Sequence, residues 1–103
     1  MSLDRRLKGV TGLPKARMDK LSFSGSADTT GTALTAGKHY MLFATADCHL
    51  HFSTTSTAAT TSNSQMVLTA GAYVTFYADS ASFVSAIQVS SSGDLYITDL
   101  GTD

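Results

Sequence analysis

Apolar and polar residues alternate along the middle of the chain. From residue 40 to residue 52 every even position is apolar, and the odd positions of the second half are Asp47, His49 and His51. A period of two is that of a β-strand with one buried and one wet face. This run is longer than a usual strand, so we expect a bend near residues 45–47, between strands at 38–45 and 47–54. The apolar positions are Tyr40, Leu42, Ala44, Ala46, Cys48, Leu50 and Phe52.

Shorter apolar runs separated by Ser, Thr and Gly predict the remaining strands. We expect strands at 65–69, 72–78, 83–90 and 94–100, and an edge strand at 21–25. About seven short strands predict an all-β fold, either a small β-sandwich or a jelly-roll-like barrel. In the strand at 83–90 the apolar set is Phe83, Ile87 and Val89. The side chains expected mainly to build the core are Phe43, Phe52, Phe76 and Phe83.

Two kinds of connecting segment stand between these strands. The tetrapeptide Leu-Thr-Ala-Gly occurs at 34–37 and again at 68–71, each time shortly before a Tyr and a strand. It predicts a turn in which Gly37 or Gly71 takes a positive φ. The segment 53–64 is rich in Ser and Thr and has no Gly or Pro. It is either a mobile hairpin tip or a contact surface.

Composition narrows the class of protein further. A chain of 103 residues is one domain by default, and it contains no Glu and only four Lys. Helical bundles usually carry those two residues on their exposed faces, so a bundle is disfavoured. The single Cys excludes an internal disulfide framework and a Cys-rich zinc module. No apolar run approaches the roughly 20 residues of a membrane-spanning helix, so we expect no membrane partner.

Charge divides the chain into a basic start and an acidic remainder. Residues 1–20 hold six Lys or Arg and two Asp, whereas residues 21–103 hold one Lys and six Asp. Gly9, Gly12 and Pro14 interrupt any helix in the basic part. We therefore expect an extended arm at 1–25 followed by a β-sandwich domain at 26–103.

The arm mixes apolar with basic side chains, which a purely solvating tail does not need. We expect it to bind a partner, although a solvated, frayed terminus is the alternative. Nucleic acid is not the expected partner, because the arm has no aromatic side chain for base stacking and the body is acidic. The residues expected to bind are Leu3, Arg5, Arg6, Leu7, Lys8, Val10, Lys15 and Arg17.

His49 and His51 are the candidates for metal binding. On a strand they project to the same face, about 6.5–7 Å apart, whereas Cys48 points to the opposite face. One chain then offers too few ligands for a closed tetrahedral site. Three chains around an axis would supply six imidazole nitrogens, enough for an octahedral metal. The simpler interpretation is an exposed polar face with Cys48 as a small buried hydrophobe, and we expect neither metal nor cofactor.

No pattern in the chain points to catalysis. A nucleophile elbow of the form Gly-x-Ser-x-Gly is missing. The spacing Gly9-x-x-Gly12-x-x-Lys15 lacks the ending of a phosphate loop and any preceding strand. A lone Cys48 on a buried face is expected to be inert. We therefore expect no catalytic residues and no enzymatic activity.

The run from Tyr40 to Phe52 resembles a recurring pattern in small structural proteins of tailed bacteriophages, in which a strand ends in a Thr-x-Asp-Cys turn. The similarity continues through 66–71, an aromatic strand with Tyr73 and Phe76, and the segments 85–88 and 93–98. It covers about residues 34–100. The arm lies outside the resemblance, and His49 and His51 carry no role that the resemblance implies.

The resemblance implies a bacteriophage virion protein rather than an enzyme. Capsid decoration, or cement, proteins of this kind are small β domains with an extended arm that bind and stabilise the head shell. The implied partners are the major capsid protein or other virion proteins, the implied state is a homo-oligomer (a dimer or trimer), and the implied location is the capsid surface rather than the tail.

Two alternatives stay open. One is a tail, neck or fibre component that forms a trimer, with the two His meeting on its axis. The other is a carbohydrate- or receptor-binding β module, in which outward-facing tyrosines stack on sugars. The orientation of the tyrosines discriminates, because core tyrosines cannot serve. The four are Tyr40, Tyr73, Tyr77 and Tyr96.

Overall fold

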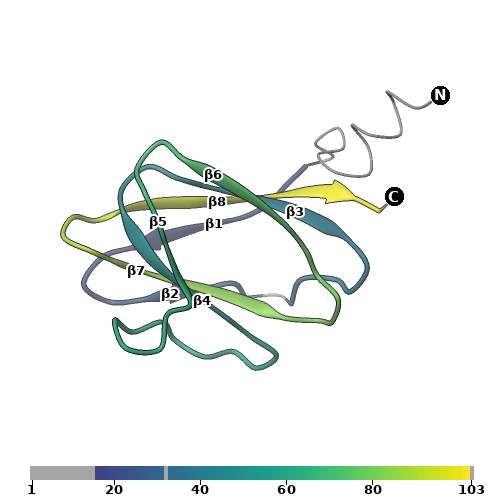
Figure 1. The fold of residues 1–103 in the computed structure, drawn as a ribbon, viewed down its shortest axis with the longest axis horizontal. Helices are drawn as coiled ribbons and strands as arrows, with labels where there is room; N and C mark the ends of the chain where they lie inside the picture. The colour runs from purple at the N-terminus through teal and green to yellow at the C-terminus, as the bar shows by residue number, and fades with distance from the viewer. Residues whose placement is uncertain (1–15, 32, 103) are drawn as a thin grey trace.

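Two antiparallel four-stranded sheets form the part of the chain that the structure describes (Figure 1). The computed structural model describes residues 16–31 and 33–102. The strand orders are β1-β8-β3-β6 in the first sheet and β2-β7-β4-β5 in the second, which confirms the predicted all-β sandwich. The strands are β1 (Ala16–Phe23), β2 (Asp28–Thr29), β3 (His39–Ala44), β4 (Cys48–Ser53), β5 (Met66–Leu68), β6 (Tyr73–Tyr77), β7 (Phe83–Gln88) and β8 (Gly93–Gly101).

The predicted bend at residues 45–47 carries the chain from one sheet to the other. β3 belongs to the first sheet and β4 to the second. Thr45 and Asp94 exchange two hydrogen bonds, and the Asp47 carboxylate accepts the Ala70 N–H at 2.7 Å. Since the corner has three residues, the even positions on both sides of it keep facing the interior. The alternation predicted over 40–52 is therefore confirmed.

The core lies between the sheets and is built mainly from aliphatic side chains. Each large apolar side chain that leaves water contributes about 1.5–3 kcal/mol. The Tyr40 ring is also buried, and its hydroxyl accepts the Thr35 N–H at 2.8 Å. No helix long and apolar enough to cross a membrane occurs in the part of the chain that the structure describes. The core residues are Leu21, Phe23, Leu34, Tyr40, Leu42, Ala44, Cys48, Leu50, Leu68, Ala78, Val84, Ala86, Leu95 and Ile97.

The two Leu-Thr-Ala-Gly turns lie at opposite ends of the β3–β6 pair. Gly37 and Gly71 have φ values of 88° and 79°, so the predicted positive φ is confirmed at both. The Gly37 N–H donates to the Ala78 carbonyl, and the Gly71 N–H donates to the Ala44 carbonyl. In each case that Ala donates back to the residue after the Gly. The repeated tetrapeptide therefore forms the same hydrogen-bonded turn at both places.

The sandwich begins earlier than expected. β1 runs from Ala16 to Phe23 and pairs with β8. Residues 16–23, which were predicted to belong to the arm, are therefore a strand of the first sheet. The cause is burial, because Leu21 and Phe23 face the core. β2 was also missed, since two residues are too short to show a period. Residues 1–15 lie outside the described part of the chain, so the binding role of the arm stays a prediction.

Two expectations about the core were wrong. Phe43 lies on the outer face of the first sheet, and Phe83 is only half-buried outside the core cluster, whereas Phe52 and Phe76 do pack against the core. On β7 the core takes Val84 and Ala86 rather than the odd positions. The reason is that β7 is covered on both faces: Ser85, which points outward, is also fully buried. When both faces of a strand are buried, its apolar residues do not alternate with polar ones, so the sequence does not indicate which face meets the core.

Candidate binding surfaces

The chain itself covers the outer face of β4 and β7 in the second sheet. The loop 54–64 packs on β4 and β7, and Ala59 at its centre is buried. The Ala59 N–H donates to the Ser85 hydroxyl at 2.8 Å. His51 Nδ1 lies 2.9 Å from the Asn63 carbonyl oxygen. The segment described from the sequence as a mobile tip or a contact surface is thus in contact with its own sheet.

His49 and His51 share the outer face of β4, as the alternation predicted, and both contact this loop. His49 Nδ1 lies 3.2 Å from the Ser64 hydroxyl, and the His51 contact to Asn63 is the one given above. Among residues 16–31 and 33–102, no group of three His, Cys, Asp or Glu side chains could hold a metal ion. Within one chain, the pair fastens the loop to the sheet.

Cys48 faces the core at the start of β4. It is a free thiol with no exposed surface. Burial, and next to it the nearby Asp47 carboxylate, raises the pKa of the Cys48 thiol to about 11. The reactive thiolate is therefore scarce at neutral pH, which agrees with the predicted role of a small buried hydrophobe.

The outer face of the first sheet carries an aromatic patch. Tyr73, Phe43 and Tyr96 lie in direct register across β6, β3 and β8, and Met41 and Tyr77 lie on the same face beside them. We call these five residues the aromatic face. Phe43, Tyr73 and Tyr77 expose 36%, 66% and 54% of their surface. Large apolar side chains at this exposure, side by side, are typical of a contact surface.

The orientation of the tyrosines bears on the carbohydrate-binding alternative. Tyr40 is in the core and cannot contact a ligand, whereas Tyr73 and Tyr77 point outward on β6. Sequence reasoning named these tyrosines but missed Phe43 and Met41 as surface residues. The signal was present, since both occupy odd positions in the alternating run and odd positions face outward.

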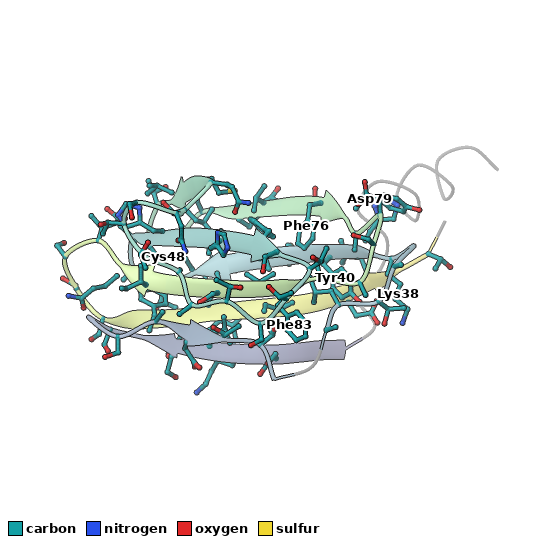
Figure 2. All side chains as sticks on the ribbon, turned by 90° about the horizontal axis from the view of Figure 1, so that it is seen from below. Lys38, Tyr40, Cys48, Phe76, Asp79 and Phe83 are labelled. Atoms are coloured by element: carbon teal, nitrogen blue, oxygen red, sulfur yellow. The ribbon has the colours of Figure 1, made fainter. Side chains whose placement is uncertain are left out.

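A groove lies at one side of the sandwich, where the two sheets separate. Its volume is about 380 Å³. Phe52 of β4, Met66 of β5, and Val74 and Phe76 of β6 form its apolar floor. Figure 2 shows Phe76 and Asp79 near the same end of β6. The polar residues of the rim are Ser53, Thr54, Asp79, Ser80 and Ser82.

Strand packing explains why this side stays open. β5 has only three residues and pairs with β4 as far as Leu50. At the next position the side chain of Gln65 replaces a strand: it accepts the Phe52 N–H at 2.6 Å and donates to the Phe52 carbonyl at 2.9 Å. Beyond that point the floor of the groove has no strand above it.

Seven of the eight predicted arm residues lie outside the described residues: Leu3, Arg5, Arg6, Leu7, Lys8, Val10 and Lys15. The main chain of Arg17 is in β1, opposite Thr98, and its side chain is not described. No protein-family model matches the chain, and neither the curated proteins nor the solved structures compared with it give a match.

Proposed function

We propose that the chain is a structural protein of a tailed-bacteriophage particle that binds the head shell, and not an enzyme. The observation that carries the proposal is that the outer faces of the two sheets differ in their exposure to solvent. In one sheet the loop 54–64 covers β4 and β7, whereas the other sheet presents the aromatic face to solvent. The resemblance of residues 34–100 to small virion proteins supplies the kind of particle.

The aromatic face has the composition of a protein contact. Tyr, Phe and Met are enriched at the centres of interfaces, and charged residues are depleted there. Aromatic side chains also lose little conformational freedom when they bind, because they rotate about only two bonds. On this proposal the face meets the major capsid protein or another virion protein, and copies of the chain assemble as dimers or trimers on the shell.

The basic start of the chain adds a second contribution. Its Lys and Arg side chains favour an acidic partner surface, and such attraction mainly speeds association. The order of events is then electrostatic capture followed by burial of apolar surface. The aromatic face remains the main source of affinity.

Counting copies in purified particles tests the assignment to the virion. Mass spectrometry with the major capsid protein as internal standard gives the number of copies per particle. A number that matches the symmetry of the shell lattice is expected for a head decoration protein. A number sufficient for one closed ring would move the protein to the neck or tail, and none at all would refute a virion role.

Substitutions on the aromatic face test how the protein binds. Phe43→Ser combined with Tyr73→Ser removes two aromatic rings from the face without touching the core, so the fold is expected to persist. Shell binding should weaken at least ~10-fold, equivalent to about 1.4 kcal/mol. Val67→Ser is the matched control, since Val67 is 49% exposed but lies on the other sheet. Equal binding by both variants would exclude this face as the contact.

A glycan is the second candidate ligand, favoured by the outward orientation of Tyr73 and Tyr77. Residues four apart on a strand lie about 13 Å apart on the same face, so both rings could stack on one saccharide chain. Screening the intact protein against immobilised glycans tests this, with Tyr77→Ser expected to abolish any binding found. Glycan binding without shell binding would replace the shell proposal.

A further inference from the structure

The groove has a lining suited to an extended peptide. Four apolar side chains form its floor, hydroxyl groups line its rim, and Asp79 supplies one negative charge. In the described part of the chain the ion pair is Lys38–Asp99, and Asp79 has no cation partner there. Such a site favours a ligand that brings apolar side chains together with a Lys or Arg.

The main chain beside the groove is able to receive another strand. β6 is the last strand of its sheet and pairs only with β3 among the described residues. Its even positions hydrogen-bond toward β3, as the flanking bonds of Ala72 and Ala78 show. Antiparallel pairing alternates, so the N–H and C=O groups of Tyr73, Thr75 and Tyr77 point to the open side. An added strand would find three residues of unpaired backbone there.

The chain carries a peptide of the required kind. Residues 3–8 read Leu-Asp-Arg-Arg-Leu-Lys, and in an extended strand Leu3, Arg5 and Leu7 fall on one face. The two leucines match the apolar floor. The basic side chains match the carboxylate of Asp79 at the rim.

β1 lies in the same sheet as β6, so the peptide at residues 3–8 is tethered close to the groove. Ala16, Asp99, Tyr40 and Phe76 lie in register across the first sheet. Three strand spacings, about 14 Å, separate Ala16 from Phe76, and a strand added beyond β6 would lie one spacing further, at about 19 Å. Residues 9–15 span up to about 24 Å when extended, and they contain Gly9, Gly12 and Pro14, which suit a change of direction.

We propose that the groove is a binding site for an extended peptide with apolar and basic side chains, and that residues 3–8 of the same chain occupy it as a strand added parallel to β6. The short tether raises the local concentration of the peptide to about the millimolar range, which favours the chain's own segment over a second copy. This inference concerns the free protein and does not depend on the shell-binding role.

Cross-linking in the full chain tests the proposal. All variants carry Cys48→Ala. The test pair adds Val10→Cys and Ser80→Cys, which leave Leu3, Leu7 and the basic residues in place. The control pair adds Val10→Cys and Gly31→Cys. Gly31 lies at the same end of the sandwich but beyond β2, on the side away from the groove, and a Cβ there meets no atom within 4 Å.

A short bismaleimide reagent should link the test pair within one chain at several times the yield of the control pair. The further change of Leu3→Asp with Leu7→Asp should abolish that difference. In urea the order should reverse, because residue 31 is nearer to residue 10 along the sequence. Equal yields in the native protein would overturn the proposal. A product linked between two chains would also overturn it, and would assign the groove to a second copy.

Discussion

The Ser85 hydroxyl lies fully buried on β7, where it makes three hydrogen bonds. It accepts from the Thr29 hydroxyl and from the Ala59 N–H, and it donates to the Asp28 carbonyl. These bonds use the donor and both lone pairs of a hydroxyl. One side chain thus joins β2, β7 and the loop 54–64.

We expect Ser85→Ala to lower the free energy of unfolding by about 1–3 kcal/mol, because the buried Ala59 N–H loses its acceptor. Chemical denaturation followed by circular dichroism measures the change. Amide hydrogen exchange should also become faster in the loop. Ser90→Ala, at an exposed position, is the control and should change little. Similar stability of the two variants would show that the loop does not depend on this hydroxyl.

Cys48 makes stability depend on pH in the alkaline range. Its pKa is raised to about 11 in the folded chain, against about 8.5 for an unfolded thiol. Below about pH 8.5 both states hold the proton, and this group leaves stability unchanged. Between about pH 8.5 and 11 the unfolded state loses its proton first, so the free energy of unfolding should fall as pH rises.

Denaturation curves across this pH range test the effect, with Cys48→Ala as the comparison. The variant should show a shallower alkaline decline than the native chain. Alkylation gives an independent readout: the native thiol should react far more slowly than the same thiol in urea. Parallel pH profiles for the two proteins would assign the decline to other groups.

Gly93 is required for close packing at the start of β8. A Cβ there would lie 2.7 Å from the Ala46 Cβ and 3.1 Å from the Phe23 ring. We expect Gly93→Ala to cost about 1–3 kcal/mol through overpacking. Gly31→Ala is the matched control, since a Cβ at that position meets nothing within 4 Å. Thermal unfolding of the two variants measures the difference, and equal melting temperatures would contradict this account.

At the scale of strands, the sequence predicted best where a strand has one wet face. β3 shows clear alternation because its outer face is open, and β4 keeps it because the residues under the loop 54–64 are the polar His49 and His51. The core positions of β7 were predicted wrongly because the loop 54–64 buries its second face. The length of β1 was underestimated because its charged residues are not typical of a strand. β2 is too short for any pattern. Alternation reports exposure, so it fails where another segment changes exposure.

The turns were predictable for a different reason. A positive φ at Gly37 and Gly71 is a local property, and local sequence determines it. The groove, by contrast, draws its lining from β4, β5, β6 and the residues after β6. No short segment of sequence contains it, so only the assembled sheets reveal it.

At the scale of the molecule, the two sheets have unequal surroundings. On one, a loop that His49, His51 and Ser85 hold in place covers β4 and β7, and the other presents aromatic side chains. The sequence identified most of these residues, yet it could not say which face stayed open. That information depends on how 11 loop residues fold back over a sheet, which alternation and composition do not describe.

The pairing of β1 with β8 has a mechanical consequence. These neighbouring antiparallel strands end at the same side of the sandwich, where Ala16 lies opposite Asp99. A pulling force between residue 16 and residue 102 would break the hydrogen bonds between these two strands one after another, at low force. Under the proposed virion role, a particle that swells under internal pressure would therefore strain this domain least if the shell contacted its broad face and left its two ends unloaded.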